Sequence, residues 1–103
     1  MAKRENKFQS ELREKLEDLF PGCIVLKNDE QLCQGIFDLT VLYGPYYAAL
    51  EVKRNAAEAS DPEPNQEHYL FEVAKMGGFS AFIYPENEVE VLDALQRAFQ
   101  SGR

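Results

Sequence analysis

Two apolar runs joined by a Gly-Pro turn set the strongest constraint on the fold of this chain. Residues 36–43 and 46–53 are rich in β-branched, aromatic and other apolar side chains, and Gly44-Pro45 separates them. Runs of this composition around a tight turn are typical of an antiparallel β-hairpin. The turn also decides which residues face each other, because pairing proceeds outward from it one residue at a time.

This register brings two carboxylates together. Counting outward from the turn places Asp38 opposite Glu51, and the period of two along a strand puts Lys53 on the face of Glu51. Directly opposed like charges destabilise a sheet, and their Cβ atoms lie about 4.5–5.5 Å apart. At that separation both carboxylates can bind one hard cation such as Mg²⁺ or Mn²⁺. The alternative is an exposed sheet face whose charges have no function. A β-bulge in either strand would shift the register, and Asp38 would then not lie opposite Glu51.

Periodicity elsewhere predicts a single α/β domain over residues 1–103. Outside the hairpin, the predicted elements are a helix over Lys3–Phe20, a strand over Cys23–Leu26, a helix over Gln66–Lys75, a strand over Phe79–Tyr84 and a helix opened by Pro85. Polar loops are expected over residues 28–35 and 55–65. The order α-β-β-β-α-β-α predicts one mixed α/β layer structure, and 103 residues suit one domain.

Apolar residues at helical spacing predict the buried faces of the three helices. These residues are Phe8, Leu12, Leu16, Leu19 and Phe20 in the first helix, Tyr69, Leu70, Val73 and Ala74 in the second, and Val89, Leu92, Leu95 and Phe99 in the third. Each helix is therefore expected to pack one side on the sheet.

Composition argues against several classes of protein. No apolar stretch approaches the roughly 20 residues of a membrane helix, and the start MAKRENKFQ does not resemble a signal peptide. We therefore expect a cytoplasmic protein without a membrane partner. Cys23, Cys33 and the single His68 lack the paired spacing of a zinc site. The sequence has no Ser, Cys or His constellation that would indicate covalent catalysis. It also has no Gly-rich phosphate loop that would indicate NTP hydrolysis.

The hairpin residues also resemble a known family. Gly35-Ile36-Phe37-Asp38, followed by Glu51-Val52-Lys53 on the next strand, is similar to the signature of PD-(D/E)xK nucleases, especially the small VRR-NUC and Holliday-junction-resolvase-like enzymes of phages and prokaryotes. The resemblance extends from Glu11 to about Tyr84. It implies a restriction-endonuclease-like α-β-β-β-α-β core, a mixed sheet flanked by helices, here followed by a C-terminal helix. Phe37 departs from the pattern, since the family usually has Pro there.

The resemblance implies a role for each matching acidic or basic residue. Asp38 and Glu51 would hold Mg²⁺, for which Mn²⁺ would substitute, together with the backbone carbonyl of Val52. Lys53 would position the hydrolytic water. Glu11 matches the acidic residue of the first helix that completes the metal site, although its residue type and position equally suit a solvated charge on an amphipathic helix.

Further residues are candidates for contact with nucleic acid. Gln66 and Tyr69 match the QxxY element of the family, and their spacing puts them on one helix face, where an aromatic residue equally suits the core. Arg54 follows Lys53 and suits a phosphate contact. The basic residues of the N-terminal segment complete the set of candidates, which is Gln66, Tyr69, Arg54, Lys3, Arg4 and Lys7.

Together these features predict an Mg²⁺-dependent endonuclease that hydrolyses phosphodiester bonds in DNA. A chain this short covers little duplex, so we expect selectivity for branched, flapped or partly single-stranded DNA in recombination, repair or phage DNA processing. A homodimer would supply two active sites for paired cuts. The alternatives are a non-catalytic nuclease-fold module that binds DNA or protein, and a metal-dependent phosphodiesterase that acts on RNA.

The acidic balance of the chain bears on this prediction. The formal net charge is -7, whereas binders of nucleic acid usually have a basic surface. However, the N-terminal segment is locally basic, and a bound divalent cation would cancel part of the charge of the metal-binding acids. The balance therefore predicts a narrow, metal-dependent contact surface with weak affinity for duplex DNA.

Overall fold

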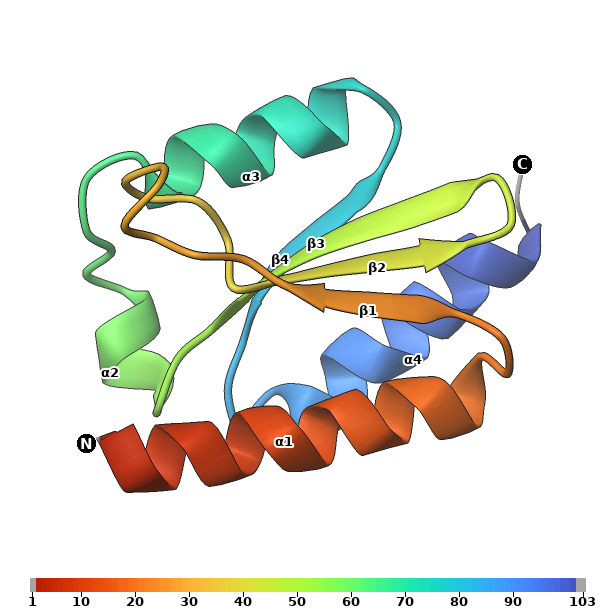
Figure 1. Ribbon diagram of the computed structural model, residues 1–103, viewed down its shortest axis with the longest axis horizontal. Helices are drawn as coiled ribbons and strands as arrows, with labels where there is room; N and C mark the ends of the chain where they lie inside the picture. Colours follow the sequence, from red (N-terminus) through yellow and green to blue (C-terminus); the bar gives the residue numbers. More distant parts are fainter. Residues whose placement is uncertain (1, 102–103) are drawn as a thin grey trace.

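The predicted hairpin lies in the middle of the sheet. The computed structural model describes the backbone of residues 2–101 and the side chains of residues 7–100 (Figure 1). Strands β2 (Leu39–Tyr43) and β3 (Tyr46–Val52) pair antiparallel, with Tyr43 opposite Tyr46 and Leu39 opposite Leu50. The predicted register is therefore confirmed, and Asp38 immediately precedes the first paired residue of β2.

Two further strands complete a four-stranded mixed sheet in the order β1-β2-β3-β4. Strand β1 (Ile24–Lys27) pairs antiparallel with β2, and β4 (Phe79–Ile83) pairs parallel with β3. The parallel pair requires a crossover, and the chain segment that contains α3 (Gln66–Lys75) provides it. The described part of the chain is thus an α/β structure with β3 as an inner strand.

Helices cover both faces of this sheet. α1 (Ala2–Leu19) and α4 (Glu88–Ser101) pack on one face, whereas α3 contacts β3 and β4 from the other (Figure 1). One apolar cluster joins α1, α4 and the sheet, and its buried members are Leu12, Leu16, Phe20, Val25, Leu39, Val41, Ala48, Leu50, Val52, Ile83, Val91, Leu95 and Phe99. Because side chains alternate along a strand, Asp38 and Glu51 face away from this cluster, toward α3.

Some boundaries differ from the prediction for local reasons. β1 begins at Ile24 rather than Cys23, and α4 begins at Glu88 rather than Pro85. Asn87 accepts a hydrogen bond from the Tyr84 backbone and donates one to the Phe82 carbonyl, so a turn precedes α4. This turn sets the rotation of α4, which leaves Val89 83% exposed and buries Val91 instead. The prediction of Val89 as a core residue was wrong.

The segment expected to be a loop over residues 55–65 contains a short helix, α2 (Ala56–Ala59). Asn55 caps it, because its side-chain oxygen accepts a hydrogen bond from the Glu58 backbone. In α3, Ala74 is exposed, contrary to the predicted apolar face, and Gln66 is buried together with Leu70. No helix in the described part of the chain is long and apolar enough to cross a membrane.

Candidate metal-binding pocket

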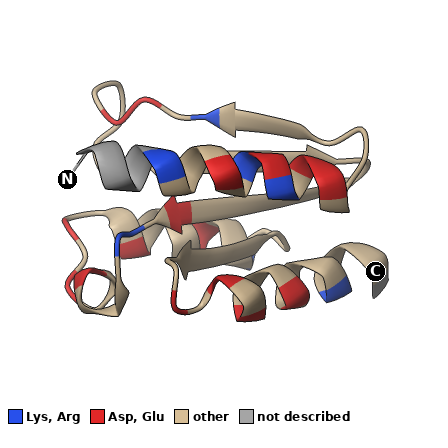
Figure 2. Cartoon of the chain, turned by 90° about the horizontal axis from the view of Figure 1, so that it is seen from below, with Lys and Arg blue, Asp and Glu red and all other residues tan. Residues whose placement is uncertain are grey.

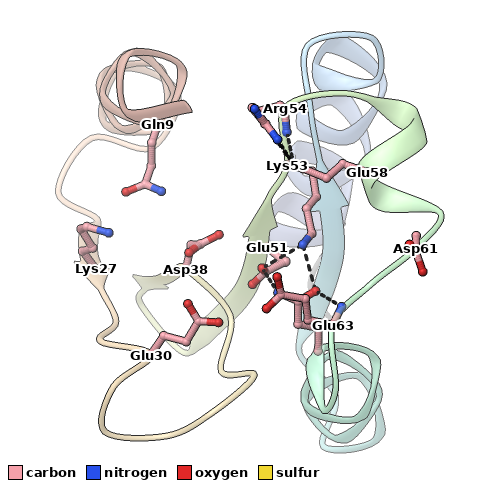
Figure 3. Close-up of a pocket in the computed structure, with 11 residues that line it drawn as sticks. Gln9, Lys27, Glu30, Asp38, Glu51, Lys53, Arg54, Glu58, Asp61 and Glu63 are labelled. Atoms are coloured by element: carbon pink, nitrogen blue, oxygen red, sulfur yellow. Dashed lines mark hydrogen bonds and ion pairs between the residues drawn. The ribbon is translucent and has the colours of Figure 1, made fainter. Parts of the chain in front are cut away.

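A cavity of about 430 Å³ opens at the end of the hairpin where Asp38 and Glu51 lie (Figure 3). Its walls come from α1, the end of β1, the loop before β2, the end of β3, and the segment from α2 to α3. Six lining residues are acidic and three are basic. The lining residues are Gln9, Lys27, Glu30, Asp38, Glu51, Lys53, Arg54, Glu58, Asp61, Glu63 and Gln66.

Asp38 is held in place by backbone hydrogen bonds from two neighbouring segments. The Val52 backbone N–H donates to Asp38 Oδ2 at 2.8 Å. The Asn28 backbone N–H donates to the Asp38 carbonyl at 2.8 Å, and its side-chain amide donates to the Phe37 carbonyl at 3.0 Å. Asn28 therefore fixes the backbone at the position where the resembled family usually has proline. Burial raises the pKa of Asp38, although the bond from Val52 opposes this effect.

Glu51, Lys53 and Gln66 form a buried network on the floor of the cavity. Gln66 Nε2 donates to Glu51 Oε2 at 2.7 Å, and Lys53 Nζ donates to Gln66 Oε1 at 2.9 Å. Lys53 Nζ also lies 3.7 Å from Glu51 Oε2. The exposed fractions of the three residues are only 4%, 6% and 4%. The amide of Gln66 thus connects the carboxylate to the ammonium group and restricts the movement of both.

One oxygen of this network lacks a partner. Glu51 Oε1 is buried and has no hydrogen-bond partner. Burial first, and the carboxylate of Asp38 second, raise the pKa of Glu51 from 4.5 to about 8. A buried acceptor without a donor is costly, and a cation next to two carboxylates would relieve both the missing bond and the repulsion.

The donor set therefore fits a hard divalent cation. Asp38 and Glu51 supply carboxylate oxygens, which Mg²⁺ and Mn²⁺ prefer. Within the described side chains, no group of three His, Cys, Asp or Glu residues is close enough to make a metal site by itself. The remaining ligands would have to be backbone oxygen, water or substrate, as is usual for Mg²⁺.

The rim of the cavity is mostly acidic on one side. Glu58 accepts hydrogen bonds from the Arg54 backbone N–H at 2.9 Å and from the Arg54 guanidinium at 2.8 and 3.0 Å. The backbone bond first, and the guanidinium second, lower the pKa of Glu58. Asp61 and Glu63 continue the same side, and the Glu63 backbone N–H donates to Gln66 Oε1. Gln9 and Lys27 lie across the cavity from them (Figure 3).

The structure brings together Asp38, Glu51, Lys53, Arg54 and Gln66, as the hairpin register and the resemblance predict. The N–H of Val52 contacts Asp38, while its side chain is buried in the core. The assignment of its carbonyl as a metal ligand stays a prediction.

Glu11 and Tyr69 do not line the cavity. Glu11 is exposed on α1. Tyr69 is half-buried, and its hydroxyl accepts a hydrogen bond from Cys33 Sγ at 3.1 Å, so it ties α3 to the loop before β2. Lys7 is exposed and is also not part of the cavity lining. Lys3 and Arg4 lie outside the range of side chains that the structure describes, so their predicted contacts with nucleic acid stay predictions.

Sequence reasoning missed Gln9, Lys27 and the acidic rim. Lys27 is the last residue of β1, and the hairpin gave no information about what lies beside it. Gln9 comes from α1 and precedes Glu11 by two residues, about 200° around a helix, so the two point to different sides. Helix phase is the signal that would have favoured Gln9 over Glu11, since Gln9, Leu12 and Leu16 follow one face.

Comparison of the chain with protein-family models, with curated proteins and with solved structures gave no match. The geometry of the cavity is therefore the basis for its functional assignment.

Proposed function

We propose that this chain is a metal-dependent nuclease of the PD-(D/E)xK type that hydrolyses phosphodiester bonds in DNA. The observation that carries the proposal is the unpartnered, buried Glu51 Oε1 beside Asp38, with Lys53 held next to the same carboxylate. A purely structural polar cluster would satisfy its hydrogen bonds internally. This one leaves open the oxygen that a cation would use.

Asp38 and Glu51 would hold Mg²⁺ or Mn²⁺, with the Val52 carbonyl as a further ligand. The chemistry that such a cation supplies is Lewis-acid polarisation of a phosphate and activation of water. The chain itself holds the two carboxylates in fixed directions. The Val52 N–H orients Asp38, and the Gln66 amide orients Glu51.

Lys53 would stabilise the negative charge that develops during hydrolysis and orient the attacking water. Its ammonium group donates to Gln66 and lies close to Glu51, so its position is set before substrate binds. A preorganised charge of this kind is more effective than a mobile one, because little reorganisation is needed during the reaction.

The expected substrate is branched, flapped or partly single-stranded DNA, as in recombination or repair. Acidic residues on the cavity rim support this preference, because Asp61 and Glu63 would repel the closely spaced phosphates of a duplex. A homodimer with two such sites would make paired cuts.

The test is cleavage of a four-way junction, a flap, a linear duplex and a single strand by purified protein, with Mg²⁺, with Mn²⁺ and with EDTA. We expect metal-dependent cleavage of at least one branched or single-stranded substrate. Asp38→Ala, Glu51→Ala and Lys53→Ala should each lower the rate at least about 100-fold, the usual scale for loss of a catalytic group.

Asp93→Asn is the matched control, because Asp93 is an exposed acid of α4 that pairs with Arg97 far from the cavity lining. Circular dichroism should show that all variants remain folded. Binding without cleavage in any metal would instead favour the non-catalytic module, and cleavage of RNA alone would favour a phosphodiesterase acting on RNA.

A further inference from the structure

A second, smaller hollow of about 210 Å³ adjoins the candidate metal-binding pocket. The two share Gln9 and Lys27 as lining residues, so they meet along the gap between α1 and the end of β1. The remaining lining residues of the smaller hollow are Ser10, Arg13 and Leu39. None of its described lining residues is acidic, whereas six residues of the larger cavity are.

The smaller hollow therefore differs in charge from the larger cavity. In the larger cavity, Lys27, Gln9 and Glu30 lie on one side, and Arg54, Glu58 and Asp61 lie on the other (Figure 3). The described part of α1 carries both basic and acidic segments, and α4 carries mainly acidic ones (Figure 2). Attraction for a polyanion therefore comes from Lys27 and Arg13 themselves, whereas Asp61 and Glu63 repel it on the side of α2.

Arg13 is held at the wall of the smaller hollow. Its Nη2 donates to the Val25 carbonyl at 2.8 Å. Val25 belongs to β1, which is an edge strand, so its outward carbonyl has no neighbouring strand to pair with. A guanidinium group has five N–H donors, and this bond engages one of its nitrogens. The bond fixes the direction of the side chain while donors remain for an anionic ligand.

We infer that a single DNA strand runs from the candidate metal-binding pocket into this smaller hollow, with its backbone phosphates on Arg13 and Lys27. This inference rests on the proposed nuclease function and adds the path of the substrate. Ser10 and Gln9 supply further hydrogen-bonding groups along that path.

A single strand suits this arrangement better than a duplex. One strand can follow Lys27 and Arg13 into the smaller hollow. A duplex carries one charge for every 1.7 Å or so of its axis and would bring phosphates of its second strand toward Asp61 and Glu63. The acidic rim would therefore repel a duplex more strongly than it repels the bound single strand.

The test is the fluorescence anisotropy of a labelled single-stranded DNA of 12 nucleotides over a range of salt concentrations. All proteins carry Asp38→Asn, so that cleavage does not interfere. Arg13→Gln and Lys27→Gln should each weaken binding roughly three- to tenfold, and each should lower the salt slope of log K by about 0.7. Arg13→Lys should retain most of the affinity.

Lys15→Gln is the control, because Lys15 lies two residues after Arg13 on α1 but pairs with Glu88 outside the smaller hollow. Binding that is equally strong in Lys15→Gln and in the double variant Arg13→Gln/Lys27→Gln would overturn the inference. A blunt duplex of the same sequence should bind more weakly, and stronger duplex binding would overturn the preference for a single strand.

Lys27→Gln keeps the test valid if Arg13→Gln fails to fold.

The result of this binding test can also be separated from the outcome of the nuclease proposal. Absence of cleavage by the unmodified protein would reject hydrolysis while leaving an Arg13-dependent and Lys27-dependent binding path intact. Cleavage without any effect of the two substitutions on binding or KM would reject only the path.

Discussion

Glu51 is buried with one carboxylate oxygen unpaired, next to a second acid that is also partly buried. Burying an ionised group without full pairing costs free energy, and the group responds by retaining its proton. Gln66 and Lys53 offset part of that cost through Oε2. The remaining cost of burial, together with the repulsion by the Asp38 carboxylate, explains why the pKa of Glu51 is raised so far.

The raised pKa of Glu51 gives a pH dependence of stability with a definite sign. Between pH 4.5 and about 8, the folded state retains a proton that the unfolded state has lost. The free energy of unfolding of metal-free protein should therefore fall as pH rises through this window, by an amount on the order of a few kcal/mol. Asp38, whose pKa is also raised, contributes in the same direction.

Urea unfolding in EDTA at pH 5, 6.5 and 8 measures this effect. Glu51→Gln should flatten most of the dependence, whereas Asp93→Asn should leave it unchanged. Mg²⁺ should restore stability to the unmodified protein at pH 8, because a ligand that binds only the folded state stabilises it. Equal stability of the unmodified protein at pH 5 and pH 8 would show that Glu51 is not buried as described.

At the scale of elements, the site depends on two loops that touch. Gly35 in the loop before β2 has a φ of 84°, and a Cβ atom there would lie 2.4 Å from the Asn65 Cβ and 2.6 Å from the Pro64 carbonyl oxygen. Asp38 follows Gly35 by three residues in the first loop, and Gln66 immediately follows Asn65 of the second. The close approach at Gly35 thus sets the distance between the two walls of the cavity.

Gly35→Ala should therefore destabilise the protein more than the same substitution at a glycine that has a similar φ but open space around it. Gly22 has a φ of 92° with no atom near its would-be Cβ, so Gly22→Ala is the control. The control should lose about 1–2 kcal/mol of stability from backbone strain. Gly35→Ala should lose roughly 1–3 kcal/mol more through overpacking and should also reduce cleavage. Thermal unfolding measures the loss of stability, and the cleavage assay measures the loss of activity. Equal losses of stability in Gly35→Ala and Gly22→Ala would mean that the two loops do not constrain each other.

The hairpin residues of the site were predictable, and the residues of the opposite wall were not. Asp38, Glu51 and Lys53 follow from counting along two strands from a turn, which needs only local information. Gln9 approaches them only after α1 has packed on the sheet, and Lys27 approaches them only after β1 has paired with β2. Neither arrangement is encoded in a short pattern. α2 was missed because four helical residues among polar residues and prolines show no apolar periodicity, and only the cap at Asn55 marks it.

At the scale of the whole molecule, the acidic balance and the proposed DNA substrate conflict until a cation is bound. The chain has a formal net charge of -7, and six acidic residues line the cavity where a phosphate would have to enter. Surface charges beyond about 10 Å are screened at physiological salt, so the local acids matter most.

DNA binding should accordingly depend on a divalent cation. We expect single-stranded DNA to bind the unmodified protein at least about tenfold more tightly in Ca²⁺ than in EDTA, since neutralising the pocket removes local repulsion. The double variant Asp38→Asn/Glu51→Gln should lose this difference. Anisotropy titrations in the two buffers measure it; identical affinities for the unmodified protein would place the bound DNA away from the pocket.

The hairpin register also limits how such a chain can change in length during evolution. An extra residue within 38–43 would turn Asp38 to the opposite face of the sheet, and one within 46–51 would turn Glu51 and Lys53. Extra residues at Gly44-Pro45, at the far end of the hairpin, would leave their pairing intact. Gaps in alignments of related sequences are thus expected at that turn and around α2, with both strands free of insertions.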